Sequence, residues 1–147
     1  MSTESNKAII RDVYGALNRG NDEAAFQRYA PDFICHMPGL PEPVRGIEAN
    51  KAMLAGFRAG FSDIRYDEQA MIAEGDKVAV RWRWSLKHTG DFQGLSPSGR
   101  EIAGTTMEFF RIENGQIMEQ WTESDNLSFM QQVGALPTME GAESGGL

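Results

Sequence analysis

The chain has 147 residues, of which 41% are apolar and 24% charged, a composition typical of a globular protein with one core. Its formal net charge is -7 and its lysines and arginines are scattered singly, so no basic surface for nucleic acid is expected. The one cysteine, Cys35, excludes a disulfide within the chain and fits a reducing compartment.

The chain shows neither of the two apolar segments that direct proteins to membranes. Its N-terminal stretch lacks an apolar run of signal-peptide length. No run approaches the roughly 18 apolar residues that a membrane-spanning helix needs. We therefore expect a cytoplasmic protein that does not contact a membrane.

The N-terminal part of the chain predicts helices. A first helix can begin at Ser5 and end at Gly20, and a shorter second helix can begin at Asn21 or Asp22. The second helix should stop before Pro31, because the residue that precedes a proline is pushed out of the helical conformation. The first helix would bury apolar residues at three- and four-residue spacing, namely Ile10, Val13, Tyr14 and Leu17.

A short strand and a third helix should follow. The strand is expected over residues 33–37, before a loop that carries three prolines. The third helix should begin after Gly46, with an apolar face formed by Met53, Leu54, Phe57 and Phe61.

From Ile64 onward the apolar residues recur with a period of two, which predicts strands over residues 64–73 and 78–88. A glycine-rich loop over residues 89–99 separates these strands from the next pair, and Asp125 can cap a last short helix. Residues 137–147 have little apolar surface to bury, so we expect a disordered tail. The inward side of the second strand would be formed by Val78, Val80, Trp82, Trp84 and Leu86.

Residues 101–126 predict a β-hairpin, because two runs rich in β-branched and aromatic residues flank the Asn-Gly pair at 114–115. Two registers are possible. A two-residue loop at this pair would place Phe110 opposite Glu119 and Glu108 opposite Trp121.

A three-residue loop with Gly115 in the left-handed conformation gives the register that we prefer. It matches apolar residues with apolar ones and polar residues with polar ones, so that one face can be buried consistently. The pairs would be Phe110 with Met118, Glu108 with Gln120, and Thr106 with Thr122.

The two faces of this hairpin should have different surroundings. The inward face would be apolar near the turn, with Ile112, and would carry a polar patch farther along, formed by Glu108, Gln120, Thr106 and Thr122. The opposite face carries Met107, Phe109 and Trp121, which is more apolar surface than a monomer usually exposes. We therefore expect a homodimer that packs through its sheets.

Helices first and long strands afterwards predict an α+β fold, with three N-terminal helices packed on a curved antiparallel sheet. Such a sheet forms a cone with an internal cavity. Residues 1–136 would form this single domain.

The more specific segments of the chain are His88-Thr89-Gly90, Ser96-Pro97-Ser98-Gly99-Arg100, FFRIENGQIMEQW and Gln132-Val133-Gly134. In this order and spacing they resemble the SnoaL-like polyketide cyclases and ester cyclases of the NTF2-like superfamily. The resemblance implies an NTF2-like cone and an intramolecular aldol reaction that uses no cofactor. The catalytic aspartate, histidine and glutamine of the family would correspond to Thr122, Glu108 and Thr106, so the cavity is carried over but the aldol mechanism is not.

Glu108 is the leading candidate for proton transfer, because burial on the inward face would raise its pKa toward neutrality. The alternative is a structural carboxylate that its neighbours hold ionised. His36, at the end of the first strand, could relay protons in the cavity or simply form part of its wall. Cys35, as its neighbour on a strand, would point to the other face and is not expected to act as a nucleophile.

The remaining candidates would bind a substrate. The aromatic residues Tyr14, Trp82 and Trp84 could line a pocket for a flat apolar molecule, although they also suit a core. Turn architecture explains His88 more simply than ligand binding does. The two histidines have no metal-ligand spacing, and the chain has no nucleotide-binding motif, so no metal or cofactor is expected. The polar residues expected to orient the substrate are Thr106, Gln120 and Thr122.

Two functions remain open. The first is a cofactor-independent enzyme with cyclase-, isomerase- or lyase-type proton transfer on a small apolar metabolite that contains a carbonyl group. The second is a module that binds a small ligand without converting it. An inward Glu108 favours chemistry, whereas the absence of the family's aspartate favours binding.

Overall fold

The computed structural model describes residues 2–138, so most of the expected disordered tail, residues 139–147, lies outside the described residues. The chain folds as one six-stranded sheet with the strand order β2-β1-β6-β5-β4-β3. Neighbouring strands are antiparallel except β1 and β6, which are parallel. The α+β prediction is confirmed. In chain order the elements are α1 (Thr3–Asn18), α2 (Asp22–Phe26), β1 (Tyr29–His36), β2 (Val44–Arg45), α3 (Ile47–Gly60), β3 (Phe61–Glu74), β4 (Lys77–His88), β5 (Glu101–Glu113), β6 (Gln116–Ser124) and α4 (Asn126–Val133).

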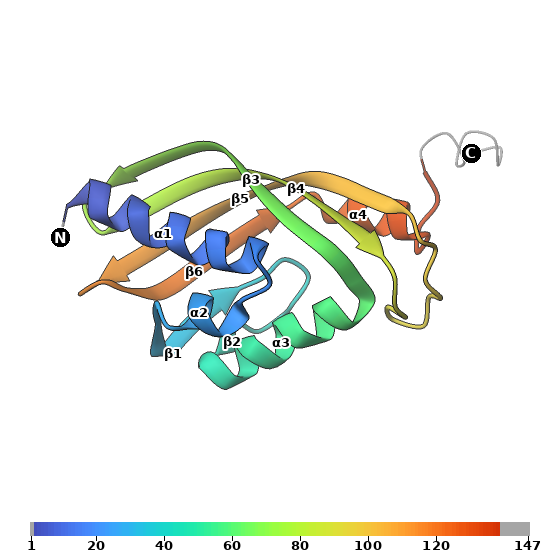
Figure 1. Cartoon of the computed structure of the whole chain (residues 1–147), viewed down its shortest axis with the longest axis horizontal. Helices are drawn as coiled ribbons and strands as arrows, with labels where there is room; N and C mark the ends of the chain where they lie inside the picture. Colours follow the sequence, from blue (N-terminus) through green and yellow to red (C-terminus); the bar gives the residue numbers. More distant parts are fainter. Residues whose placement is uncertain (1, 139–147) are drawn as a thin grey trace.

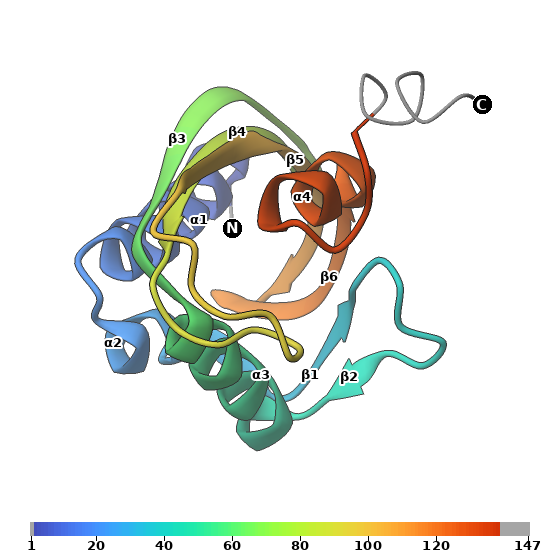
Figure 2. The same cartoon turned by 90° about the vertical axis from the view of Figure 1, so that its right-hand side faces the viewer.

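The sheet curls around an interior that the helices close. Figure 1 shows α1 lying across the sheet, with α2 and α3 below it. Figure 2 shows the strands curving around the interior, with α4 beside the open end. The core joins these layers, because Ile10 and Val13 of α1 pack with Val78 of β4 and Phe110 of β5, all of them fully buried.

The cap of helix α1 lies three residues before Ser5, the residue expected to cap it. Its N-cap is Ser2, and the Ser2 and Ser5 side chains each accept a hydrogen bond from the other residue's backbone N–H. Two of the otherwise unpaired N–H groups at this helix end are thereby satisfied. Gly20 follows the helix with a φ of 74°, which a glycine adopts without strain.

Strand β1 was expected to start at residue 33, but it starts at Tyr29. Helix α2 ends at Phe26, and Tyr29 pairs with Ile117 of β6. The register of this pair shifts between Tyr29 and Ile34, and Pro31 lies in that interval. A proline donates no hydrogen bond, so an irregular stretch of the strand accommodates it.

The hairpin is confirmed, but neither expected register is correct throughout. The turn has two residues, and Asn114 and Gly115 have φ values of 50° and 76°, as a turn matched to the strand twist requires. Glu113 therefore pairs with Gln116.

A bulge then changes the register. Ile112 pairs with Ile117, whereas Arg111 pairs with Glu119, so Met118 is the extra residue on β6. A bulge of one residue restores the alternation that the two-residue turn would have reversed. Ile117 replaces Met118 in the buried set, and the other inward residues keep their side with new partners: Phe110 with Gln120, Glu108 with Thr122, and Thr106 with Ser124.

Within residues 2–138, no helix is long and apolar enough to cross a membrane.

Candidate functional site

A cavity of about 270 Å³ lies between the concave face of the sheet and helices α1, α2 and α3. Its wall is mainly aromatic and aliphatic, with side chains such as Phe33, Met53, Phe57 and Trp84. Its polar groups gather on β5 and β6, where Glu108, Gln120, Thr122, Thr106 and Ser124 face inward. An apolar pocket with a few converging polar groups is the usual form of a small-molecule site.

Glu108 is the ionisable group at the centre of this patch. Its side chain is buried, and three side chains donate hydrogen bonds to it. The Tyr14 hydroxyl donates to Oε1. The Gln120 amide donates to Oε2 at 2.5 Å and the Thr122 hydroxyl donates to Oε2 at 2.8 Å. The predicted inward position of Glu108, Gln120 and Thr122 is thus confirmed.

Two opposing effects act on the pKa of Glu108. Burial raises this pKa because it removes water from the charged form, and the hydrogen bonds from Tyr14, Thr122 and Gln120 lower it in part. The indole N–H of Trp82 lies near enough to lower it as well, although that N–H has no hydrogen-bond partner among the described residues. The net effect is that the pKa of Glu108 is raised. Glu108 can therefore both accept and return a proton closer to neutrality than an exposed glutamate.

Tyr14 holds this carboxyl from the side of the helix. Its ring stacks on Trp82, with 4.2 Å between centroids. Burial, and after it the Glu108 carboxyl, raise the pKa of Tyr14 well above its ordinary value. Tyr14 therefore remains a neutral donor toward Glu108.

The predicted aromatic wall is only partly correct. Trp84 lines the cavity together with Tyr14. Trp82 is also buried on the inward face, but it lies behind Tyr14 and does not line the cavity. Thr106 lines the cavity, and its hydroxyl is hydrogen-bonded to that of Ser124.

His36 does not face the cavity, contrary to the expectation for it. Its ring stacks on Trp121 at 5.3 Å, and its Nε2 lies 2.6 Å from Oε2 of Glu119. These neighbours belong to the outer face of the sheet. The physical reason is alternation, because Phe33 and Cys35 of β1 point inward and their neighbour must point outward.

His88 also lies away from the cavity, so the structure does not support substrate binding by this residue. It is fully buried, and its Nδ1 faces the backbone N–H of Ser98 at 3.4 Å and the Ser98 hydroxyl at 3.3 Å. His88 N also donates to the carbonyl of Arg100. These bonds join the two ends of the loop between β4 and β5.

Several residues of the cavity were not predicted from the sequence, among them Ser124, Tyr29, Tyr66 and Cys35. Ser124 belongs here because the bulge makes it the partner of Thr106. Tyr29 was assigned to a helix, although it opens β1. Tyr66 pairs with Trp84, so the period of two from Ile64 could have placed it inward. Cys35 lines the cavity too, and burial raises the pKa of its thiol to about 12, which keeps it protonated.

The described residues contain no group of three or more histidine, cysteine, aspartate or glutamate side chains that could hold a metal ion.

The chain is similar to known proteins over most of its length. The sequence model of the family described as SnoaL-like polyketide cyclase matches residues 8–133. An aklanonic acid methyl ester cyclase of Streptomyces peucetius is 29% identical over 148 residues, which cover 96% of this chain and 98% of that protein.

The chain is also similar to solved structures over most of its length. IdmH of Streptomyces antibioticus, provisionally described as a polyketide cyclase, is 31% identical with a TM-score of 0.78 over 88% of this chain and 98% of that one. AclR of Streptomyces galilaeus, provisionally described as a hydroxylase, is 25% identical with a TM-score of 0.80 over 92% and 100%. The resemblance expected from the sequence is confirmed, and the chain belongs to the SnoaL-like polyketide cyclase family, with the NTF2-like fold.

Proposed function

We propose that this protein is an enzyme that closes a ring within one apolar, carbonyl-containing polyketide. The observation that carries the proposal is the buried Glu108 carboxyl, which has a raised pKa and lines an otherwise mainly apolar cavity. Removal of a proton from a carbon next to a carbonyl needs a base, and a carboxyl group with a raised pKa in a mainly apolar wall can act as one.

The reaction is an aldol closure in which Glu108, and not a residue at the position of the family's aspartate, serves as both base and acid. The carboxylate removes a proton from the carbon beside one substrate carbonyl, which gives an enolate. The enolate carbon forms a bond to a second carbonyl carbon of the same molecule, and the electron pair of that C=O moves to its oxygen. Protonated Glu108 then returns the proton to this oxygen. The product is an isomer of the substrate, so the balance requires no oxidant, reductant or cofactor.

The relatives support the substrate class. The relative from Streptomyces peucetius is named for an aklanonic acid methyl ester, and IdmH is provisionally described as a polyketide cyclase. We infer a related substrate here, because the cavity wall is mainly apolar and aromatic. A neutral substrate fits best, since the buried Glu108 would repel an anion.

A non-catalytic binding module is the second candidate. One observation favours it: both oxygens of Glu108 already accept hydrogen bonds from the protein, which is also how a structural carboxylate is held. In that case the cavity would retain a ligand and Glu108 would only stabilise its wall.

Glu108→Gln separates the two candidates, because it keeps the size of the side chain and removes its acid and base function. Turnover of aklanonic acid methyl ester and of related polyketides with several carbonyl groups should be measured, along with the melting temperature. We expect turnover to fall by about 100-fold or more while the fold is kept.

The matched control is Glu101→Gln, the same change at an exposed position of the same strand. It should leave turnover unchanged. Turnover that survives in Glu108→Gln would contradict the catalytic role, and binding without turnover in the wild-type protein would establish the binding module.

A further inference from the structure

Two phenol groups of the cavity lack a protein partner. Tyr29 of β1 and Tyr66 of β3 both line the cavity. Within the part of the chain that the structure describes, neither hydroxyl makes a hydrogen bond, whereas the hydroxyl of Tyr14 donates to Glu108. Tyr29 is 8% exposed, and Tyr66 is partly buried. A buried tyrosine hydroxyl usually finds a partner, so these two donors call for one.

The cavity is a place where such a partner can bind. Buried side-chain atoms that are enclosed without a partner occur at Asn6, Trp82 and His88, and neither tyrosine oxygen is among them. Both side chains line the cavity, so a molecule bound there is a candidate partner for their hydroxyl groups. A ligand with acceptor oxygens would satisfy both.

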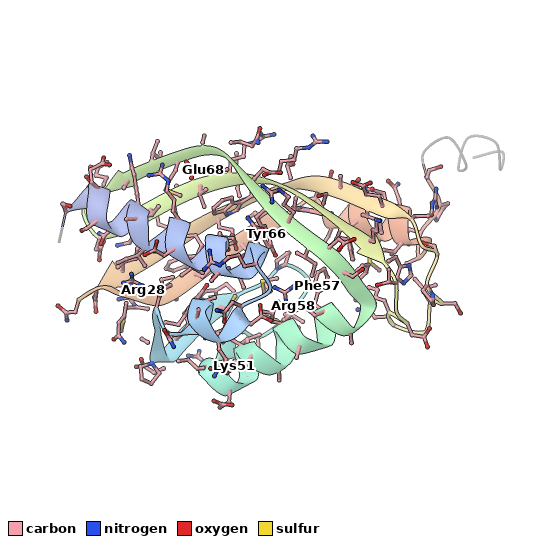
Figure 3. All side chains as sticks on the ribbon, in the orientation of Figure 1. Arg28, Lys51, Phe57, Arg58, Tyr66 and Glu68 are labelled. Atoms are coloured by element: carbon pink, nitrogen blue, oxygen red, sulfur yellow. The ribbon has the colours of Figure 1, made fainter. Side chains whose placement is uncertain are left out.

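Both rings are held in place before any ligand arrives. Tyr66 packs edge-on against Tyr14, with 5.0 Å between the ring centroids. Its backbone N–H and C=O are both hydrogen-bonded to the Asn18 side chain, at 2.7 and 2.9 Å, and Figure 3 shows Tyr66 beside the C-terminal end of α1. Tyr29 packs edge-on against Phe33 at 4.4 Å. Donors fixed in this way lose little freedom when they bind a ligand.

The charge of Glu108 acts on both phenols. Burial first, and the Glu108 carboxyl second, raise the pKa of Tyr29 and of Tyr66. Both groups therefore stay protonated and can donate. Glu108, Tyr29 and Tyr66 all line the same cavity.

We propose that Tyr29 and Tyr66 donate hydrogen bonds to two carbonyl oxygens of the substrate and hold it with a carbon beside one carbonyl against Glu108. This inference rests on the proposed function and deepens it. A hydrogen bond to the carbonyl makes the neighbouring proton more acidic and strengthens as the enolate forms. The ligand class is a flat, neutral molecule with at least two carbonyl oxygens.

Binding of two matched probes tests this assignment without any turnover. Hydroxymethylanthraquinone and hydroxymethylanthracene have nearly the same flat outline and differ in two carbonyl oxygens. Quenching of tryptophan fluorescence reports their binding, because Trp84 lines the cavity. The wild-type protein should bind the quinone more tightly than the hydrocarbon.

Tyr29→Phe and Tyr66→Phe should each weaken quinone binding by about fivefold, and the double variant by about 25-fold, with hydrocarbon binding nearly unchanged. Ser85→Ala, which removes a hydroxyl group from the outer face of β4, should leave both affinities unchanged. Equal loss for both probes, or a wild-type protein without preference for the quinone, would overturn the proposal. Because the readout is affinity, its failure is distinct from a failure of Glu108 in turnover.

Discussion

The hydroxyl of Tyr14 donates a hydrogen bond to Oε1 of Glu108, across 94 residues of sequence. This bond joins α1 to β5 inside the cavity. The other oxygen, Oε2, is held by Gln120 and Thr122 of β6. The two oxygens thus have separate supports, one from the helix and one from the neighbouring strand, and each support can be removed on its own.

Tyr14→Phe should raise the pKa of Glu108 further, because the lost hydrogen bond is one of those that lower it. It should also reduce the free energy of unfolding by about 1 kcal/mol. Carbon-13 NMR titration of the glutamate carboxyl groups measures the pKa, and urea unfolding measures the stability. Thr122→Val should shift the pKa in the same direction, whereas Thr105→Val, on the outer face of β5, should not. A pKa that falls in Tyr14→Phe would show that the Tyr14 hydrogen bond does not stabilise the ionised form of Glu108.

The free energy of unfolding should depend on pH in part through the raised pKa of Glu108. Because its pKa in the folded protein is raised above the ordinary 4.5, the folded state binds this proton more tightly than the unfolded chain. This contribution favours folding below pH 4.5 and is lost as the pH rises from there through the raised pKa. Relative to the wild-type protein, Glu108→Gln should therefore gain stability as the pH rises through that window. Urea unfolding at a series of pH values measures the difference.

Glu119 should change the stability with pH in the opposite direction from Glu108. The hydrogen bond from His36, and further the one from Arg111, lower the pKa of Glu119 below 4.5. Its contribution to stability is present above pH 4.5 and is lost as the pH falls through the lowered pKa. Glu119→Gln should consequently be least different from the wild-type protein in acid. If both variants follow the same trend, the assignment of the two pKa shifts is wrong.

The sequence could predict which side chains of the hairpin point inward, because the alternation of residues along a strand follows directly from which face is buried. The sequence could not predict which residues of β5 and β6 pair. The Asn-Gly turn and the alternation of inward and outward residues demand registers that differ by one residue. The chain satisfies both with a bulge at Met118, and nothing in the local sequence marks its place.

The prediction of which side chains face the cavity failed where it depended on contacts between residues distant in sequence. The inward side of β1 follows from its parallel pairing with β6, which leaves His36 outside and Cys35 inside. Tyr14 and Glu108 could each be recognised from their own helix or strand. Their hydrogen bond could not, because it depends on how α1 crosses the sheet.

Gly104 is the residue that makes room for Trp84 in the cavity wall. A Cβ atom at position 104 would lie 2.6 Å from Cζ2 of the Trp84 indole, which is too close without movement of the ring. Gly104→Ala should therefore lower the free energy of unfolding by about 1–3 kcal/mol. Gly56→Ala is the control, because a Cβ there meets nothing within 4 Å and alanine favours the helix. Thermal unfolding should show loss in the first variant and none in the second. Equal stability of both would mean that the indole moves freely.

The outer face of the sheet is apolar in the middle and oppositely charged at its sides. Met107 and Phe109 of β5 are 59% and 43% exposed. Met107 pairs with Arg81 on one side and with Glu123 on the other. If two copies pack face to face about a two-fold axis along β5, β4 of each copy lies over β6 of the other. Arg81 of each copy then faces Glu123 of the other, and the apolar residues meet at the centre.

We therefore expect a homodimer in solution, and its charge pairs provide the test. Arg81→Glu or Glu123→Arg alone should weaken the dimer, because each places like charges opposite each other, and the two changes together should restore it. Trp121→Glu should dissociate it, whereas Leu40→Glu, at a 48% exposed position of the loop before β2, should not. Sedimentation equilibrium at micromolar concentration measures the wild-type protein and the five variants, and circular dichroism checks that each is folded. A wild-type monomer, or a double variant that stays as weak as the single ones, would rule out this arrangement of the two sheets.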